Sequence, residues 1–377
     1  MHDNLPTIRI GFMPLTDCAS LVMAVERGYD RQHGIRIVLS RETSWASLRD
    51  KLGSGALDAA HALYGMVYGV QLGIGCQQQD MAVLMNLSQN GQAITLSRAL
   101  ADGGAASAEM LEHAMRAGPR AYTFAHTFPT GNHAMLLYYW LAAYGVDPLR
   151  DVRTVTVPPT QMAPSLREGM IDGFCAGEPW GQRAVDEGIG VTAATSQQIW
   201  PDHPGKVLGT RAAYAEQHAG ACRALIAAVL EAGRWIDACD ENKLEAAKVL
   251  AGPAYLNAPA HMIAPRLLGQ YQNGLGESWS DPNALAFHRD GTVNFPYLSD
   301  GMWFMTQHRR WGLLRHDPDY LAVACRVNQV ELYREAAQMT GTPVPTALLR
   351  SSRLIGGTVW DGSDPAGYAG SFDIHNM

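Results

Sequence analysis

The sequence predicts an α/β fold with two lobes and a helical C-terminal extension. Short apolar runs alternate with helical patterns at the spacing of βαβ units, first over residues 7–97 and again over 120–197. After about residue 200 the pattern becomes mainly helical. The 377 residues, 47% of them hydrophobic, suffice for two or more domains. We therefore expect residues 1–97 to begin the first lobe, 98–197 to form the second, and 198–377 to return to the first lobe and add the extension.

The first lobe is expected to combine four strands with three helices. Each predicted strand is a short apolar run next to a turn, and each predicted helix has apolar residues at helical spacing. Gly34 ends the first helix, and Thr43 or Ser44 is placed to cap the second. The predicted strands are 7–15, 35–40, 56–62 and 81–88, and the predicted helices are 18–34, 43–55 and 64–75.

The second lobe repeats this alternation. Residues 98–120 are rich in Ala, Gly and polar groups, and we expect them to carry the crossing between the lobes. The predicted strands are 120–125, 152–157, 171–177 and 190–196, and the predicted helices begin after Thr130 and cover 160–170 and 178–188. In the extension we expect helices over 220–239, 241–252, 299–314 and 318–341, and then a loop-like stretch over 351–377.

Composition argues against several classes of protein. The net charge of −7, without a basic stripe, disfavours direct binding of nucleic acid. No apolar run approaches the roughly 20 residues that span a bilayer. The start of the chain has neither the basic region nor the apolar core of a signal peptide, so we expect a cytoplasmic protein unless a leader was removed. The six cysteines form no CxxC pair and fit a reducing compartment.

His133 lies at or just inside the start of the helix in "FPTGNHAMLLYYWLAAYGVDP". The free N–H groups and the dipole of a helix start favour an anion. Gly131 and Asn132 in front of it allow close approach of the backbone. The alternative is a polar residue at a helix start that faces solvent. This segment alone leaves both interpretations open.

Two candidates in the first half of the chain have ordinary structural alternatives. Trp45 opens the helix "SWASLRDKL" and offers one indole N–H to a ligand, or it packs in the core. Gln92 follows the Asn-Gly turn of "SQNGQAI" at a strand end. Its amide donates to a ligand there, or it only completes the turn.

The other candidates follow the second lobe's helices. Gly177, in "FCAGEPW", offers its backbone N–H to a ligand or only relieves a tight turn. Glu178 balances charge at the next helix start or faces the other lobe. Lys206 follows two prolines in "IWPDHPGK", and a surface lysine is the ordinary alternative.

The five candidates other than Glu178 share the ability to donate hydrogen bonds. They supply an ammonium, an imidazole, an indole N–H, an amide and a backbone N–H. The sequence has no GxSxG, P-loop or HExxH motif and no positioned nucleophile–base pair. We therefore expect capture of a small anion rather than an enzyme, with no metal and no cofactor.

Several motifs, in this order, resemble the nitrate- and bicarbonate-binding proteins of bacterial ABC transport systems, the NrtA-like family. The likeness runs from about residue 7 to residue 315. Its motifs are "SWASLRDKL", "NGQAI", "FPTGNHAMLLYYWLAAYGVDP", "VPPTQM", "FCAGEPW", "GIGVTA", "IWPDHPGK" and "FPYLSDGMWFMTQHRRWG". The resemblance implies a two-lobe periplasmic-binding-protein-like (type II) fold with a C-terminal helical extension and an anion between the lobes.

The resemblance also implies a ligand set. The residues that hold nitrate in the family fall on Trp45, Gln92, His133, Gly177 and Lys206. Bicarbonate-binding relatives carry an acidic residue in place of the lysine and use calcium, so Lys206 favours nitrate or nitrite. We expect the anion itself to supply the countercharge that a buried Lys206 requires. We also expect Lys206→Glu to abolish binding while leaving folding mostly intact.

The predicted role follows from the start of the chain. Transport members are exported behind a signal peptide, and a chain without one resembles the NasS-type nitrate sensors. Those are cytoplasmic and sequester a NasT-type antiterminator, an RNA-binding protein with an ANTAR domain, until nitrate or nitrite binds. The expected function is therefore a cytoplasmic nitrate/nitrite sensor with this partner, without direct contact with nucleic acid or a membrane. The alternative is the substrate-binding component of a nitrate ABC transporter.

A thiamine-precursor-synthase-like enzyme on the same fold is disfavoured, because its clustered cysteine motif is missing. The helical stretches 302–315 and 318–340 are candidate surfaces for the partner. Trp303 and Trp311 within them are either exposed for that contact or part of the core.

Overall fold

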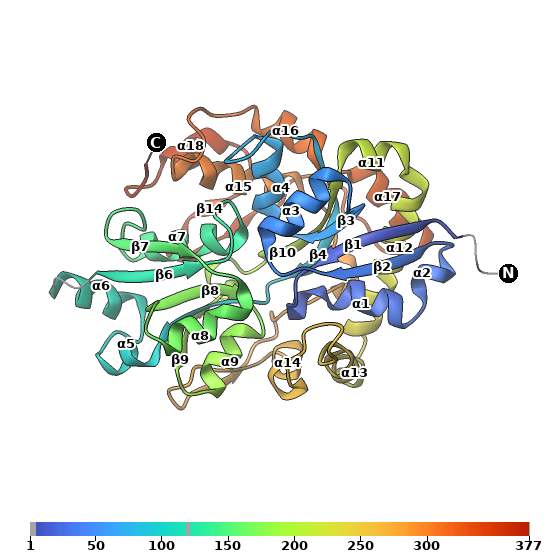
Figure 1. The fold of residues 1–377 in the computed structure, drawn as a ribbon. Coiled ribbons are helices and arrows are strands. Elements are labelled where there is room, and N and C mark those ends of the chain that lie inside the picture. Colours follow the sequence, from blue (N-terminus) through green and yellow to red (C-terminus); the bar gives the residue numbers. More distant parts are fainter. Residues whose placement is uncertain (1–4, 118–120, 377) are drawn as a thin grey trace.

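The computed structural model describes residues 5–117 and 121–376. Two five-stranded sheets form two lobes that lie side by side, and part of the C-terminal segment covers them at the top of Figure 1. The predicted two-lobe α/β fold with a C-terminal extension is confirmed. In the described part of the chain, no helix has the length and apolar character needed to cross a membrane.

The first sheet has the strand order β2-β1-β3-β10-β4. Strand β1 (Thr7–Phe12) pairs in parallel with β2 (Arg36–Arg41) and β3 (Ala59–Ala62). Strand β10 (Pro204–Arg211) lies antiparallel between β3 and β4 (Met81–Gln89). The sequence did not predict β10, because "PGKVLGTR" begins with proline and contains two glycines, which are features of turns. Its two neighbouring strands supply the pairing that makes it a central strand.

The second sheet has the strand order β7-β6-β8-β5-β9. Strand β6 runs parallel to both of its neighbours, β7 and β8. Strand β5 is antiparallel to both of its neighbours, β8 and β9. The strands are β5 (Gln92–Ser97), β6 (Tyr122–His126), β7 (Val152–Thr156), β8 (Gly173–Gly177) and β9 (Gly190–Thr195).

The chain crosses from the first sheet to the second at Asn90–Gly91. Both residues have positive φ angles, 63° and 80°, which an Asn-Gly pair adopts readily. Residues 92–97, which we expected to end the first lobe, therefore form strand β5 of the second sheet. The segment 98–120, where we expected the crossing, contains two helices instead, and residues 118–120 lie outside the described residues. Its helices are α5 (Arg98–Asp102) and α6 (Ala108–Ala117).

The helices of the first lobe follow the predictions with one break. The predicted helix 18–34 divides at Gly28, whose φ is 72°. Ser44 caps the next helix by accepting a 3.1 Å hydrogen bond from the Ser47 N–H, which decides between the two predicted caps. The elements are η1 (Thr16–Cys18), α1 (Ala19–Glu26), α2 (Tyr29–Gln32), α3 (Trp45–Ser54) and α4 (Tyr64–Gln71).

The second lobe has its helices at the predicted places, and a short helix leads the chain back to β10. These elements are α7 (Asn132–Ala143), η2 (Pro159–Gln161), α8 (Met162–Arg167), α9 (Trp180–Asp186) and α10 (Ser196–Ile199).

The extension is helical, as predicted. Trp303 and Trp311 are both buried, so they belong to the core and not to an exposed surface. The predicted helix 318–341 divides at Asn328, whose side-chain amide donates to the Tyr64 hydroxyl over 2.8 Å. The elements are α11 (Ala212–Gln217), α12 (Ala219–Asp237), α13 (Asp240–Leu250), α14 (Ala260–Leu267), β11 (Gln270–Gln272), β12 (Ser278–Ser280), η3 (Arg289–Gly291), α15 (Leu298–Arg310), α16 (Tyr320–Val327) and α17 (Val330–Met339).

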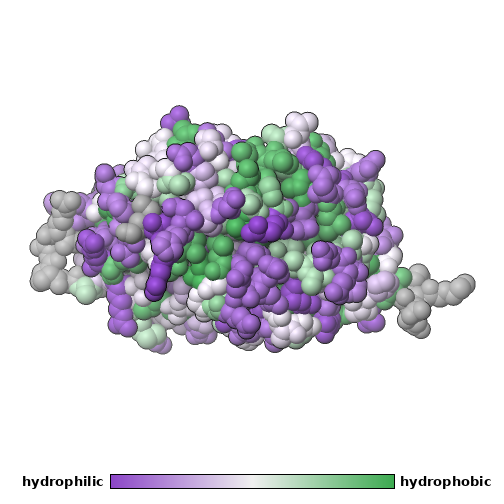
Figure 2. Space-filling view, turned by 90° about the horizontal axis from the view of Figure 1, so that it is seen from above, coloured by the Kyte–Doolittle hydropathy of each residue, from purple (hydrophilic) through white to green (hydrophobic). Residues whose placement is uncertain are grey.

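The tail after α17 is structured, although its sequence is loop-like. The Trp360 indole N–H donates to the Ser299 carbonyl over 2.9 Å, and the Trp303 indole N–H donates to the Tyr368 hydroxyl over 3.3 Å. These bonds hold the tail against α15. Figure 2 shows the upper face, where hydrophilic residues surround small apolar areas. The tail contains β13 (Ser352–Arg353), η4 (Ile355–Gly357), β14 (Val359–Trp360) and α18 (Pro365–Gly370).

Candidate functional site

The predicted site residues lie together where the two sheets face each other. Parallel strands β1, β3, β6 and β8 end at this edge, and the antiparallel strands β5 and β10 begin there. Hydrogen bonds join the lobes beside the site. The Thr16 N–H donates to the Glu178 carbonyl over 2.7 Å, and the Trp180 indole N–H donates to the Pro14 carbonyl over 3.2 Å.

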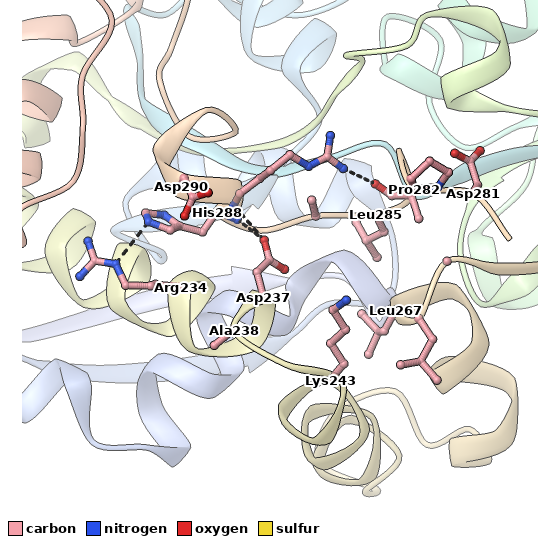
Figure 3. A pocket seen from close by; sticks show the side chains of 15 residues that line it. Arg234, Asp237, Ala238, Lys243, Leu267, Asp281, Pro282, Leu285, His288 and Asp290 are labelled. Carbon is pink, nitrogen blue, oxygen red and sulfur yellow. Dashed lines mark hydrogen bonds between the residues drawn. The ribbon is translucent and has the colours of Figure 1, made fainter.

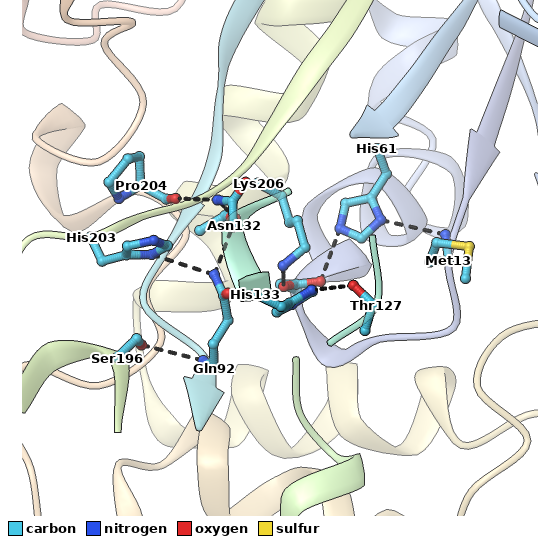
Figure 4. Close-up of polar contacts among 12 residues, drawn as sticks. Met13, His61, Gln92, Thr127, Asn132, His133, Ser196, His203, Pro204 and Lys206 are labelled. Carbon is cyan, nitrogen blue, oxygen red and sulfur yellow. Dashed lines mark hydrogen bonds and ion pairs between the residues drawn. The ribbon is translucent and has the colours of Figure 1, made fainter. Parts of the chain in front are cut away.

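Lys206 is fully buried near the start of β10 and forms an ion pair with Asp17. Its Nζ donates to Asp17 Oδ2 over 2.7 Å, and both side chains have an exposed fraction of 0%. The second carboxylate oxygen of Asp17 accepts a 2.9 Å bond from His61 Nε2. Lys206 and His61 thus share this carboxylate, and Figure 4 shows their two side chains close together. The surface-lysine alternative is therefore wrong.

The protonation of this cluster follows from its contacts. The Met13 N–H points to His61 Nδ1 over 3.4 Å, so Nδ1 accepts and the imidazole proton lies on Nε2, facing Asp17. Burial lowers the pKa of His61, and the ring is neutral. Burial alone would raise the pKa of Asp17, but Lys206 and His61 together lower it below its ordinary value. The cluster is thus an ammonium–carboxylate pair supported by a neutral imidazole.

Trp45 lies beside this cluster at the start of α3. Its ring centroid is 5.9 Å from that of His61 and 6.4 Å from that of His133. The side chain is buried, but the indole Nε1 has no hydrogen-bond acceptor in the described part of the protein. Because a buried indole N–H usually finds an acceptor, this donor is available to a ligand.

His133 is buried in the first turn of α7, so the solvent-facing alternative is wrong. Its Nδ1 lies 2.5 Å from Thr127 Oγ1, whereas its Nε2 has no partner among the described residues. Burial and then the charge of Lys206 lower the pKa of His133. The ring is therefore neutral, and it carries a proton on Nε2 when the Thr127 hydroxyl donates to Nδ1.

Asn132, just before His133, joins the helix start to the first lobe. Its Nδ2 donates to the carbonyls of Pro204 and Gly205 over 3.1 and 3.0 Å, and its Oδ1 accepts from the Gly65 N–H over 3.3 Å. These three bonds place the start of α7 against β10 and α4.

Gln92 begins β5, but its amide does not point as expected. Its Nε2 donates to the Gly205 carbonyl over 3.3 Å and lies 3.4 Å from His203 Nδ1. The Oε1 atom is the one without a partner in the described part. The site thus contains a free acceptor at a position where we predicted an available donor.

Gly177 ends β8 directly opposite Gln92 in the strand register. A Cβ atom on this glycine would lie 3.2 Å from Leu15 Cδ1 and 3.6 Å from Asp17 Oδ2. The missing side chain therefore allows the backbone of the second lobe to approach Asp17. Glu178 next to it is buried and pairs with Arg266 over 2.9 Å, while its Oε2 accepts from the Gln182 N–H at the start of α9.

Sequence reasoning missed three polar members of the site, Asp17, His61 and Thr127. Asp17 follows β1 after a short loop, Thr127 directly follows β6, and His61 is the one polar residue in the strand "AAHA". Their position at the carboxyl ends of parallel strands could have identified them, because these ends meet at the edge of the sheet where ligands bind. The expectation that the anion supplies the countercharge of Lys206 is wrong, since Asp17 supplies it within the protein.

An open pocket of about 480 Å³ lies elsewhere, between α12, α13 and the segment before η3 (Figure 3). No predicted site residue lines it. Its central carboxylate, Asp237, accepts from the backbone N–H groups of Phe287, His288 and Arg289. Arg234 Nε donates to His288 Nε2 over 3.3 Å. These polar groups are satisfied within the protein. In the part of the chain that the structure describes, no cluster of three or more His, Cys, Asp or Glu side chains is placed to hold a metal ion.

Comparison with known proteins places the chain among anion-binding proteins. A family model described as NMT1-like matches residues 2–251. The nitrate/nitrite binding protein NrtA of Synechocystis sp. PCC 6803 is 35% identical over 100% of this chain and 87% of its own length. The bicarbonate-binding protein CmpA of Synechococcus elongatus is 30% identical over 98% of this chain and 87% of its own length.

A solved structure agrees with these relatives. The crystal structure of the periplasmic nitrate-binding protein NrtA from Synechocystis PCC 6803 superimposes with a TM-score of 0.93 at 34% identity, covering 98% of this chain and 99% of that one. The chain therefore belongs to the NMT1-like family and, within it, to the NrtA-like nitrate- and bicarbonate-binding proteins.

Proposed function

We propose that this protein binds nitrate or nitrite between its lobes, at Trp45, Gln92, His133, Gly177 and Lys206. One observation carries the proposal. Two buried ring nitrogens, Trp45 Nε1 and His133 Nε2, lack partners in the described structure and belong to the same cluster as the Lys206 ammonium. Buried polar atoms without partners are rare, and a small anion satisfies both of these.

The chemistry suits a planar monovalent anion with three acceptor oxygens. The indole N–H of Trp45 and the Nε2–H of His133 donate to two of its oxygens, and Lys206 provides the positive charge. Asp17 and His61 hold the ammonium in place through bonds of 2.7 and 2.9 Å. Because the site is buried, these donors act at low dielectric, where hydrogen bonds to an anion are strong.

The site also discriminates by its acceptors. Bicarbonate carries a hydroxyl that needs an acceptor, and both oxygens of Asp17 are already bonded to Lys206 and His61. With Asp17 occupied, the acceptor left for that hydroxyl is the neutral Oε1 of Gln92, and a hydrogen bond to a neutral acceptor is weaker than one to a carboxylate. Nitrate and nitrite need no acceptor, and Lys206 supports a monovalent anion without a metal. We therefore expect nitrate or nitrite to bind more tightly than bicarbonate.

Isothermal titration calorimetry on the purified chain tests the proposal. Nitrate, nitrite, bicarbonate and chloride are titrated separately at the same ionic strength. We expect saturable heats with nitrate or nitrite, and much weaker heats with the other two anions. Absence of both heat and thermal stabilisation with nitrate and nitrite would falsify the proposal.

For the biological role, we propose the substrate-binding component of an anion importer. The chain is also similar to proteins named nitrate import ATP-binding protein NrtC and bicarbonate transport ATP-binding protein CmpC, and these names support this role. The cytoplasmic sensor that releases a NasT-type antiterminator stays a prediction from the sequence and uses the same ligand site. A pull-down with a NasT-type protein, with and without nitrate, separates the roles. Capture that nitrate reverses supports the sensor, and no capture in either condition supports the importer.

A further inference from the structure

Arg310, the last residue of α15, is a buried cation without a carboxylate partner. Its exposed fraction is 3%. In the described part of the chain, its side chain makes one hydrogen bond, from Nε to the Ile374 carbonyl over 3.0 Å, and its Nη1 has no acceptor. A guanidinium has five N–H donors, and a buried charge normally has a partner of opposite sign. The unpartnered Nη1 therefore indicates a missing acceptor.

Aromatic rings surround this guanidinium. Its central carbon lies 3.6 Å from the ring centre of Phe372, 4.3 Å from that of Trp311 and 5.3 Å from that of Tyr139. Burial lowers the pKa of Arg310 to about 10, so it remains charged at neutral pH. Ring faces stabilise the cation electrostatically but do not accept its in-plane N–H groups as an anion does. The cage thus holds the arginine in position without neutralising it.

Arg310 lines a pocket of about 450 Å³ between the end of α7 and the tail. Ala142 and Ala143 of α7 and Phe372 of the tail supply apolar walls, and Thr358 and Ser371 supply hydroxyl groups. The volume is in the range of small-molecule sites. Asp373 also lines the pocket, but it is exposed and makes no ion pair with Arg310. A multiply charged anion is disfavoured by this neighbouring carboxylate.

We propose that this pocket is a second ligand site, which binds a small organic monocarboxylate through Arg310. The two oxygens of the carboxylate accept in-plane N–H groups of the guanidinium, the fork geometry for which arginine is suited. The short carbon chain lies against Ala142, Ala143 and Phe372. This site is separate from the nitrate site and does not rest on the proposed function.

Calorimetry or ligand-observed NMR on the full chain with sodium butyrate tests the site. n-Butylammonium, which has the same carbon chain and the opposite charge, and sodium phosphate and sodium nitrate serve as comparisons. We expect saturable binding of butyrate and no binding of n-butylammonium. Butyrate should bind equally before and after the nitrate site is saturated with sodium nitrate, which makes the result independent of the nitrate site.

Three variants locate the binding. Arg310→Gln should weaken butyrate binding by about tenfold or more, because it removes a charged hydrogen bond. Ala143 is exposed at the end of α7 and lines the pocket, so Ala143→Leu narrows the pocket and should also weaken butyrate binding. This variant tests the site even if Arg310→Gln does not fold. Arg309→Gln, which changes the neighbouring arginine outside the pocket, should leave butyrate binding unchanged.

Three results would overturn the proposal. The first is the absence of saturable butyrate binding. The second is binding that neither Arg310→Gln nor Ala143→Leu weakens. The third is phosphate or nitrate binding at Arg310 as tightly as butyrate, because this would contradict the assignment to carboxylates.

Discussion

At the scale of single residues, Lys206 and Asp17 form a buried pair whose members depend on each other. Both side chains are inaccessible to solvent, and their charged atoms are 2.7 Å apart. Removing one member of such a pair leaves an uncompensated buried charge, which costs about 3–5 kcal/mol. This pair therefore determines the stability of the site.

Lys206→Met is expected to abolish nitrate binding and to lower the free energy of unfolding by about 3–5 kcal/mol, because Asp17 stays buried without its cation. The double variant Lys206→Met with Asp17→Asn should recover much of that stability and still not bind nitrate. Lys206→Glu places a second carboxylate beside Asp17, so our expectation that it leaves folding mostly intact is withdrawn. Chemical denaturation measures the free energy of unfolding of these variants, and calorimetry measures their nitrate affinity. A Lys206→Met protein as stable as the wild type contradicts this account.

His133→Ala is expected to weaken nitrate binding by about 1–3 kcal/mol, because it removes a buried donor to the anion. His261→Ala, at an exposed histidine on α14, is the matched control and should have no effect. Thr127→Val should also weaken binding, since it removes the hydroxyl next to Nδ1 that places the proton on Nε2. Calorimetric titration measures the nitrate affinity of the three variants. Equal affinities in His133→Ala and the wild type would remove His133 from the site.

Nitrate affinity is expected to fall as the pH rises. Burial and Lys206 lower the pKa of His133. An anion bound next to Nε2 favours the imidazolium form and raises this pKa again. Binding therefore takes up protons wherever the pH lies between the free and bound values, and affinity increases toward lower pH. Titrations between about pH 5 and 8 in buffers of different ionisation enthalpy measure the proton uptake. A flat profile, or one that persists in His133→Gln, contradicts the mechanism.

At the scale of elements, the contact between α4 and the turn before α7 positions His133. The Thr130 carbonyl accepts a 2.8 Å hydrogen bond from His308 Nε2 on α15. The same carbonyl lies so close to Gly65 on α4 that a Cβ atom there would overlap it. Elements of both lobes thus meet within one turn of the site, and a small residue on α4 allows the approach.

Gly65→Ala is expected to lower the free energy of unfolding by about 1–3 kcal/mol through overpacking and to weaken nitrate binding by displacing the start of α7. Gly220→Ala is the control, because a Cβ there meets only Arg223 Nη2 at 3.9 Å. It should be neutral or stabilise the helix by about 0.5–1 kcal/mol. Denaturant unfolding of both variants tests the contrast. Equal stability of the two variants would show that the contact is not tight.

At the scale of the whole molecule, several buried histidines are held neutral. Burial lowers the pKa values of His126 and His308 to about 4. His126 ends β6 beside the site, and His308 lies on α15 under the turn before α7. The low dielectric around them opposes their protonation in the folded state. Low pH therefore destabilises the junction between the lobes.

Thermal stability is expected to fall as the pH decreases from about 6.5 toward 4. The unfolded histidines have a pKa of about 6.5, so between these values the unfolded state binds more protons, and stability is lost as the pH falls. Between pH 6.5 and pH 4, each of the two histidines lowers the free energy of unfolding by on the order of 3 kcal/mol. Thermal melts across this range measure the effect. His308→Gln should flatten the profile, and an unchanged slope would exclude His308 as a contributor.

Much of the fold was predictable from the sequence, because local patterns determine it. The alternation of apolar runs and helical periods specified two α/β lobes, and Ser44 capped α3 as one of two expected residues. The loop-like tail and strand β10 were not predictable. Their residues have weak local preferences, and partners far away in the chain, such as Ser299 for Trp360, hold them in place.

The sequence by itself determined which residues would be candidates at the site, since Trp45, Gln92, His133, Gly177 and Lys206 do lie around one buried junction. Only the tertiary structure decided what surrounds the lysine. Asp17 is 189 positions away from Lys206, and no local pattern relates them. The strand order that inserts β10 between β3 and β4 brings them together, and burial then requires the carboxylate as the partner of the ammonium.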